Sequence, residues 1–197
     1  MPKIVDHEQR RIAILQQAFR LFAKNGYQES SLSHLAEVCN ISRPTLYHYF
    51  RDKEAIFNYA MKYYTDQMFS VYRDVASHSG PVLLQIRKIV ADIITRSWHS
   101  RDFVISLGDF ISQKRHEGFD VPETIRRRTV KLDYLLRRMI REGMESGEIR
   151  TISVEATSMQ ILDFIQAYLF KLAIINYADP QQTIEVISAF LDVLAAE

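Results

Sequence analysis

The sequence has few of the residues that break or cross-link a chain. Its 197 residues contain one cysteine, five prolines and six glycines. Cys39 alone forms no internal disulfide and cannot build a thiolate metal site, so we expect a reduced, cytoplasmic protein. Because the prolines and glycines fall mostly between long periodic segments, we expect helices joined by short turns and little β-structure.

Long apolar runs are also scarce. Residues 1–9 carry three charged side chains and lack the apolar centre of a secretory signal. The most apolar stretch, residues 158–176, is interrupted by polar residues that include Gln160, Asp163 and Lys171. A buried helix is therefore expected there rather than a membrane span.

The sequence shows no strong excess of either charge. The net charge is +1, and residues 1–60 hold eight Lys or Arg against six Asp or Glu. Bulk charge therefore gives no sign of nucleic-acid binding, and the evidence for such binding must come from a motif. The content of 47% hydrophobic and 25% charged residues is typical of a soluble globular protein.

Motifs of common enzyme and metal sites are missing. The sequence has no G-x-S-x-G, no H-E-x-x-H, no glycine-rich phosphate loop and no paired cysteines. His99 and His116 do not match a metal-ligand spacing. We therefore expect a protein that is not an enzyme and that holds no metal and no cofactor.

Helical periodicity covers most of the chain. Ile12, Leu15, Phe19 and Phe22 repeat at the spacing of one helix face, and Asn25-Gly26 supplies a stop. Serine, aspartate and proline residues mark later helix starts. The pattern predicts an all-α fold of about nine helices, at residues 6–24, 31–40, 42–50, 52–78, 82–99, 102–115, 122–146, 154–177 and 180–196.

Two of the predicted helices are short and closely spaced. Residues 39–42 join them, and Ser42 with Pro44 begins the second. In that second helix Leu46 and Phe50 are spaced to pack inward, which turns Tyr47 outward. The arrangement predicts a helix-turn-helix whose second helix suits the major groove of DNA.

The run from Gly26 to Glu54, GYQESSLSHLAEVCNISRPTLYHYFRDKE, resembles the DNA-binding signature of TetR/AcrR-family regulators. The resemblance is strong over residues 8–60 and departs from the usual pattern at Cys39, Asn40 and Pro44. It implies a three-helix helix-turn-helix domain at residues 1–52. It also implies a helical regulatory, ligand-binding and dimerisation domain at residues 53–197.

The resemblance also implies which side chains meet DNA. Its phosphate contacts are Ser30, Ser31, Ser42, Tyr47 and Lys53, and its groove-facing residues are Arg43, Pro44, Thr45 and His48. Arginine binds guanine edges, and hydroxyls bind phosphate oxygens, so the residue types fit this division. The alternative is that His48 and Lys53 are solvated surface residues and that Tyr47 only packs.

The last two predicted helices are apolar on nearly every side. One helix-turn-helix reads few base pairs, so a homodimer is expected, and a two-sided apolar helix needs a second partner. The predicted dimer interface contains Ile161, Phe164, Ile165, Leu169, Leu172, Ile187, Phe190 and Leu191. The alternative is that both helices are simply core.

Aromatic residues between the predicted DNA-binding helices and the last two predicted helices predict a pocket for a small hydrophobic or amphipathic effector. The predicted lining contains Trp98, Phe103, Asp109, Phe110, Tyr134 and Tyr168, with Phe119 and Met139 as further members and His99 and His116 as further polar groups. Aromatics at helical spacing are more often packed core, which is the alternative for each of them.

Together these features predict a ligand-responsive repressor. It would bind a palindromic double-stranded DNA operator as a homodimer and be released when the effector binds the C-terminal domain. A helix-turn-helix activator or architectural factor controlled by a protein partner is the alternative. The operator, the effector and the regulated genes are not encoded in any motif of the sequence.

Overall fold

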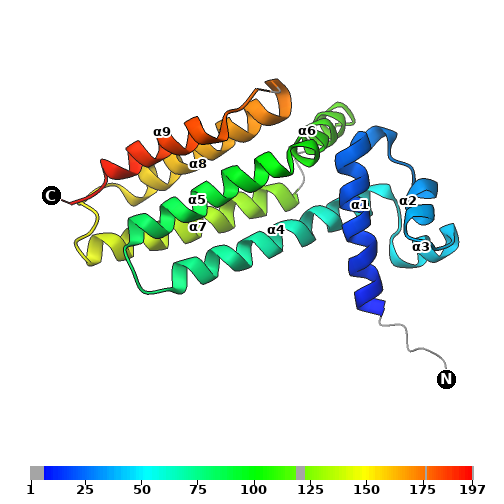
Figure 1. Cartoon of the computed structure of the whole chain (residues 1–197), viewed down its shortest axis with the longest axis horizontal. Coiled ribbons are helices and arrows are strands. Elements are labelled where there is room, and N and C mark those ends of the chain that lie inside the picture. Colours follow the sequence, from blue (N-terminus) through cyan, green and yellow to red (C-terminus); the bar gives the residue numbers. More distant parts are fainter. Residues whose placement is uncertain (1–6, 119–122, 176, 197) are drawn as a thin grey trace.

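A computed structural model describes residues 7–118, 123–175 and 177–196, and these residues confirm the all-α prediction. Figure 1 shows the chain as a set of packed helices. The helices are α1 His7–Glu29, α2 Leu32–Val38, α3 Arg43–Tyr49, α4 Lys53–Ser77, α5 Val82–His99, α6 Arg101–His116, α7 Glu123–Glu145, α8 Val154–Phe170 and α9 Pro180–Asp192. A π-helical turn, η1 Lys171–Ile175, continues α8.

The helices form two groups joined by α4 and α6 (Figure 1). The short helices α2 and α3 lie beside α1 at one end of the molecule. Helices α5, α7, α8 and α9 pack together toward the other end, where the C-terminus lies. Helix α1 packs on both α4 and α6, so these two helices connect the groups.

Side-chain caps set most helix starts, as the sequence predicts. Five N-cap side chains accept a backbone N–H from the first turn, and they belong to Ser31, Ser42, Asp52, Ser153 and Asp179.

Helix α1 is kinked at its predicted stop. Gly26 has a φ of 75° and a ψ of 167°, and the last few residues resume the helix after it.

Two helix ends differ from the sequence prediction. Residues that were predicted as the end of one long helix form η1. The sequence did not indicate this, because five residues carry too little periodicity to distinguish 3.6 residues per turn from a wider turn. Helix α9 stops at Asp192, since the following backbone bonds to residues 148–150, with Arg150 N–H donating to the Leu194 carbonyl at 3.0 Å. Positions 6, 122 and 176 of the predicted helices lie outside the described residues.

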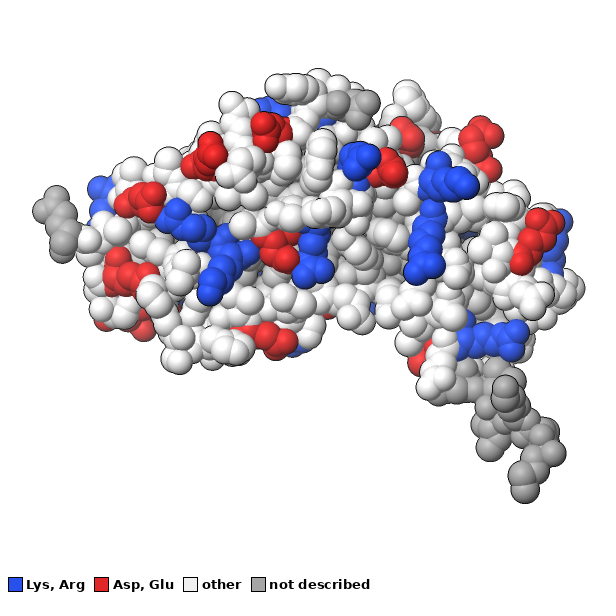
Figure 2. Space-filling model, viewed as in Figure 1, with Lys and Arg blue, Asp and Glu red and all other residues white. Residues whose placement is uncertain are grey.

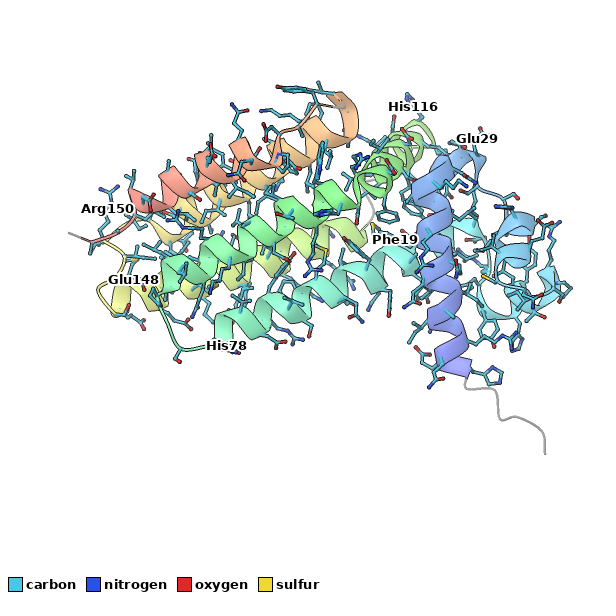
Figure 3. The ribbon with its side chains drawn as sticks, viewed as in Figure 1. Phe19, Glu29, His78, His116, Glu148 and Arg150 are labelled. Atoms are coloured by element: carbon cyan, nitrogen blue, oxygen red, sulfur yellow. The ribbon has the colours of Figure 1, made fainter. Side chains whose placement is uncertain are left out.

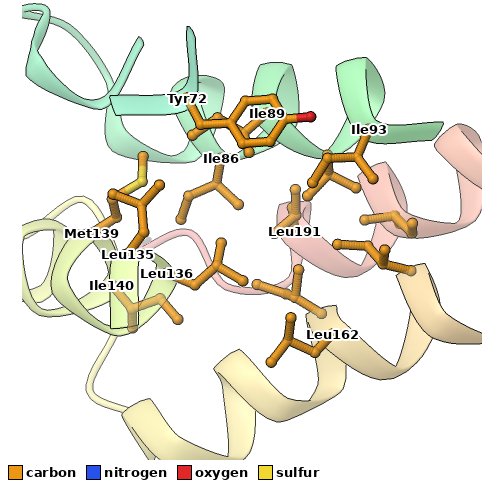
Figure 4. Close-up of a cluster of buried hydrophobic side chains, with 14 of the residues drawn as sticks. Tyr72, Ile86, Ile89, Ile93, Leu135, Leu136, Met139, Ile140, Leu162 and Leu191 are labelled. Atoms are coloured by element: carbon orange, nitrogen blue, oxygen red, sulfur yellow. The ribbon is translucent and has the colours of Figure 1, made fainter. Parts of the chain in front are cut away.

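Buried apolar side chains form two clusters. The C-terminal cluster joins α4, α5, α7, α8 and α9, and Figure 4 shows part of it, including Tyr72, Ile89, Leu136 and Leu191. The N-terminal cluster joins α1, α2, α3, α4 and α6. Phe103 and Phe110 of α6 belong to the N-terminal cluster, so the core around α1 extends past residue 52. The domain boundary at residue 52 stays a prediction.

One segment has the length and composition of a membrane span. Val154–Ile175, which covers α8 and η1, has a window with a mean hydropathy of 1.3, of which 33% is buried in the molecule. This is weak evidence, because a core helix of a soluble protein passes the same test. Several apolar side chains of this segment, among them Ile161, Ile165 and Tyr168, are buried in the molecule.

Candidate nucleic-acid interface

Helix α3 is anchored by one face and open on the other. Leu46 is fully buried at 0% exposure, and Phe50 at its end is also buried. Arg43, Pro44 and His48 are exposed, and Tyr47 is 45% exposed. The helix therefore presents a face of hydrogen-bonding side chains while its apolar face fixes it to the N-terminal cluster.

The hydroxyls that begin α2 and α3 serve as caps. Ser31 Oγ accepts the His34 N–H at 3.1 Å. Ser42 Oγ accepts the Thr45 N–H at 3.2 Å and lies 2.8 Å from Thr45 Oγ1. Ser31 and Ser42 are exposed. Each oxygen therefore stays open to solvent while it fixes the start of its helix.

Two residues that the resemblance assigns to phosphate face the protein instead. Ser30 is 3% exposed, and its hydroxyl donates to the Gly26 carbonyl at 2.6 Å. Lys53 Nζ donates to the carbonyls of Tyr27 and Gln28 at 2.9 and 3.1 Å. Burial lowers the pKa of Lys53. Both side chains hold the end of α1 against its neighbours.

Residues outside the predicted set also border α3. His7 Nδ1 lies 3.1 Å from the Tyr49 hydroxyl, which ties the start of α1 to the end of α3. Arg51, directly after α3, has a side chain that is 86% exposed and donates to Asp52 at 2.7 Å. The backbone N–H of Ala55, and then Arg51, lower the pKa of Asp52. The position of Arg51 beside the predicted helix was the only sequence signal for it.

Figure 2 shows acidic and basic side chains interspersed on the face in view, without one continuous basic patch. The near-neutral balance of the sequence therefore holds on this surface as well. This face therefore offers no broad basic field that would attract phosphate.

The predicted pocket residues are not brought together. Phe103 and Phe110 are packed in the N-terminal cluster, where the Phe103 ring stacks 4.0 Å from that of Phe19. Trp98 packs partly against the C-terminal cluster, and Tyr168 is buried within it at 1% exposure. The remaining two, Asp109 and Tyr134, are exposed. Met139 lies in the C-terminal cluster, and Phe119 lies outside the described residues.

A cavity lies instead between α4, α5, α7 and α8. It has a volume of about 220 Å³. Its walls are mainly apolar and include Met68, Phe69, Tyr72, Ile93, Leu162 and Ile165. Sequence reasoning missed it, because these residues come from separate helices and each alone has the pattern of ordinary core. Among the described residues, no group of three His, Cys, Asp or Glu side chains is placed to hold a metal ion.

The predicted dimer residues lie mostly inside the chain. Five of them are buried in the C-terminal cluster, namely Ile161, Ile165, Leu172, Ile187 and Leu191. Phe164, Leu169 and Phe190 are partly buried, and the rings of Phe164 and Phe190 meet edge to face at 5.5 Å. Other apolar side chains on α8, η1, α9 and the residue after α9 are more than half exposed, namely Met159, Phe170, Ile174, Ile175, Val186 and Val193.

Comparison with known proteins gives consistent similarities. The family model of bacterial regulatory proteins, tetR family, matches residues 14–60. A Mycobacterium tuberculosis HTH-type transcriptional repressor, Rv1474c, is 38% identical over 73 residues, which are 36% of this chain and 39% of that protein. The Escherichia coli repressor ComR is 26% identical over 75% of this chain and 70% of its own length. The chain spans about a third of two Bacillus subtilis relatives, covering 31% of YuxN and 37% of PksA.

Solved structures share the whole fold. A TetR transcription regulator from Haloarcula marismortui has a TM-score of 0.84 at 15% identity, covering 95% of this chain and 99% of that one. The Bacillus subtilis regulator FadR, solved in complex with stearoyl-CoA, has a TM-score of 0.74 at 18% identity, covering 93% and 97%. Residues 14–60 thus match the model of the TetR family, and the chain as a whole shares its fold with TetR-family regulators of known structure.

Proposed function

We propose that this chain is a cytoplasmic transcriptional repressor. It binds a palindromic DNA operator as a homodimer and leaves the operator when a small molecule binds its C-terminal part. The observation that carries the proposal is the open face of α3, where Arg43, Tyr47 and His48 stand exposed while Leu46 is fully buried. A helix held in this way can enter the major groove without losing its place in the core.

The side chains around α3 divide by chemistry. Arg43 is placed to read guanine O6 and N7, and Pro44, Thr45 and His48 line the same groove. The exposed hydroxyls of Ser31, Ser42 and Tyr47 bind phosphate oxygens and fix the register. Ser30 and Lys53 support this surface from behind through their bonds to the end of α1.

The exposed apolar surface of α8, η1 and α9 is proposed as the dimer interface. Phe170, Ile174 and Val186 are each more than half exposed, and a monomer rarely leaves such a patch uncovered. The buried residues behind them shape this surface without reaching the partner. Sedimentation velocity tests the point, because Val186→Glu should shift the protein toward monomer, whereas Glu185→Gln on the neighbouring exposed position should leave it a dimer.

Helix α4 is proposed to carry the signal. Three residues separate its start from the end of α3, and further along, at Met68, Phe69 and Tyr72, it forms a wall of the cavity. A ligand in the cavity changes operator affinity only if it binds the DNA-incompetent arrangement more tightly than the competent one. A small tilt of α4 would move the two α3 helices away from half-sites about 34–36 Å apart.

The direct test is selection of bound sequences from random duplex DNA by the purified full-length protein. A repressor that works as proposed enriches one palindromic sequence. Enrichment of an unpaired half-site alone would contradict the homodimer, and the absence of any enrichment would contradict operator reading.

A further inference from the structure

Resting on the function proposed above, we propose that Arg11 of α1 is a positioning residue for the DNA-reading helix α3. Its guanidinium holds the aromatic residue that ends α3 against an aromatic ring of α4. His7, one turn earlier in α1, holds the tyrosine next to that residue. Arg11 acts through these rings and does not need to touch DNA.

Helix α3 depends on its surroundings for its direction. It has only seven residues, and a helix this short is not stable by itself. The Ser42 hydroxyl fixes its start by accepting the Thr45 N–H. At its other end Phe50 is buried, and its N–H donates to the Leu46 carbonyl at 3.0 Å. The contacts made by this end therefore decide where α3 points.

Two side chains on one face of α1 reach the end of α3. His7 and Arg11 are four residues apart, which makes them neighbours on the surface of a helix. His7 Nδ1 lies 3.1 Å from the Tyr49 hydroxyl. The guanidinium carbon of Arg11 lies 5.8 Å from the centroid of the Phe50 ring and 4.5 Å from that of Tyr59 in α4. One turn of α1 thus contacts two consecutive residues at the end of α3 and joins them to α4.

The surroundings of Arg11 suit an arginine. Its Nε is buried and has no hydrogen-bond partner among the described residues, and its ion pair with the exposed Glu8 is long, at 4.0 Å. The centroids of the Phe50 and Tyr59 rings lie 6.0 Å apart, so one guanidinium contacts both. A planar guanidinium stacks on aromatic faces better than a lysine ammonium, which holds its water more tightly. We therefore assign the attraction mainly to the two rings.

The direction of α3 matters more for reading bases than for binding phosphates. Contacts to base edges require the side chains of α3 to be held within about 0.5 Å, and phosphate contacts carry no sequence information. If α3 also adopts other directions, the operator affinity falls in proportion to the time that it spends in the reading direction. Loss of the Arg11 contact should therefore lower the preference for the operator over other DNA.

Arg11→Met tests this role, because it removes the guanidinium and keeps an unbranched apolar side chain. We expect the ratio of affinities for the selected operator and a scrambled duplex to fall about tenfold, which is about threefold for each α3 of a homodimer. The salt dependence of binding should not change, because no phosphate contact is lost. A salt dependence that becomes weaker by about one phosphate contact would show that Arg11 binds DNA directly, and would overturn the inference.

The matched control is Arg20→Met, which removes an exposed arginine from the same helix. It should leave the ratio of affinities unchanged. Equal falls in the ratio for Arg11→Met and Arg20→Met would show that the charge of α1 matters and that the contact with the rings does not.

A double-mutant cycle tests whether Arg11 acts through the rings. Tyr59→Leu removes the α4 ring of the contact and leaves α3 unaltered, so it should also lower the ratio of affinities. The variant with both changes should lose no more than the worse single variant, because each change breaks the same contact. Losses that add would contradict the assigned contact.

Hydrogen exchange of the free protein gives a measurement without DNA. The Phe50 amide should exchange about threefold faster in Arg11→Met than in the natural protein, because the end of α3 opens more often. His7→Ala should have a smaller effect in the same direction, since its contact with Tyr49 is exposed. Unchanged exchange at Phe50 in Arg11→Met would overturn the inference, and unchanged exchange in His7→Ala would remove His7 from it.

The natural protein is measured first by fluorescence anisotropy on both duplexes. If it prefers the operator and Arg11→Met keeps the full preference, this inference fails and the proposed function stands. If the natural protein binds both duplexes equally, the proposed function fails, and the inference that rests on it fails as well.

Discussion

Arg43 and Tyr47 are held away from the protein because Leu46, next to Tyr47 in α3, is fully buried. Ser42 fixes the start of the helix with its hydroxyl, so the direction in which Arg43 leaves the chain is set by local bonds. A long side chain held at its base loses less freedom on binding than one on a mobile loop. The reading of DNA is thus proposed to depend on a few well-placed side chains rather than on net charge.

Replacement of Arg43 tests the reading of bases. Arg43→Ala should cost about 1–3 kcal/mol of operator binding and relax the preference at one base position, because a bidentate contact to guanine is lost. Arg150→Ala is the control, since Arg150 is exposed at the opposite end of the molecule (Figure 3). Fluorescence anisotropy with the selected operator and with a scrambled duplex measures both. Equal losses on the two duplexes would show that Arg43 contacts only phosphate.

A second residue, Tyr27, makes the stability of the folded protein depend on pH. It is buried beneath Lys53 and packs against Phe22, Phe57 and Phe110. Burial raises its pKa from the usual value near 10 to about 12, and the charge of Lys114 partly opposes this. The folded protein therefore keeps the Tyr27 proton at a pH where the unfolded chain has already lost it.

This difference predicts an alkaline loss of stability. As the pH rises from 10.0 toward about 12, the free energy of unfolding should fall, because only the unfolded chain releases the proton. Tyr27→Phe should make the fall shallower, and the control Tyr177→Phe, at a residue that is 73% exposed, should not. Urea unfolding at several pH values gives the slopes. Identical slopes for the natural protein and Tyr27→Phe would contradict the assigned burial effect.

At the scale of elements, α6 belongs to both halves of the molecule. One face places Phe103 and Phe110 in the N-terminal cluster, and the other packs on η1, where a side chain at Gly108 would come within 3.3 Å of Ala173. At its C-terminal end Lys114 pairs with Glu54 of α4 at 2.7 Å. The element thus ties α4, the proposed carrier of the ligand signal, to α1 and to the proposed dimer interface.

A substitution of Phe103 tests whether this residue belongs to the packed core or lines a ligand pocket. Phe103→Ala should lower the free energy of unfolding by about 3–5 kcal/mol, because the ring is 3% exposed and stacks on Phe19. Val130→Ala, at a residue that is 61% exposed and lies outside the proposed dimer interface, should change it by no more than about 0.5 kcal/mol. Urea unfolding of both variants decides the matter. A small stability loss for Phe103→Ala would favour the original prediction that this ring lines a ligand pocket.

The sequence predicted where the helices lie better than it predicted which helices pack together. Caps such as Ser42 and Asp179 act within one helix turn, so a local pattern finds them. The sequence of one helix also shows which of its faces points inward, but it does not show which other helix packs against that face. Periodicity marked Phe103 and Ile161 as apolar without saying that one packs on α1 and the other inside the bundle. The cavity around Tyr72 arises only when four helices meet, so no single stretch indicated it.

At the scale of the whole molecule, the proposed boundary at residue 52 separates roles rather than independent folding units. The N-terminal cluster draws six buried residues from beyond it, namely Ile56, Phe57, Ala60, Met61, Phe103 and Phe110. A fragment that lacks them leaves the apolar faces of α1 and α3 in water. The N-terminal cluster therefore draws on both sides of the proposed boundary, and the proposed shift in α4 would reach α3 through it.

Fragments test this shared core. A peptide of residues 1–52 should be largely unfolded by circular dichroism. A fragment of residues 1–118, which contains every member of the N-terminal cluster, should keep clearly more helix per residue. A cooperative thermal transition in the shorter peptide would show that the N-terminal part folds alone, and the coupling through α6 would then lose its basis.

The central claim is that α3 reads a specific DNA sequence, and the most direct measurement is the ratio of affinities for the selected operator and a scrambled duplex of equal length. Fluorescence anisotropy over a range of salt concentrations gives both affinities. The account predicts operator binding about 10³-fold tighter or more, a ratio that persists while both affinities fall with salt. Equal affinities that fall together with salt would show that the protein binds DNA only through its phosphates, and would contradict the account.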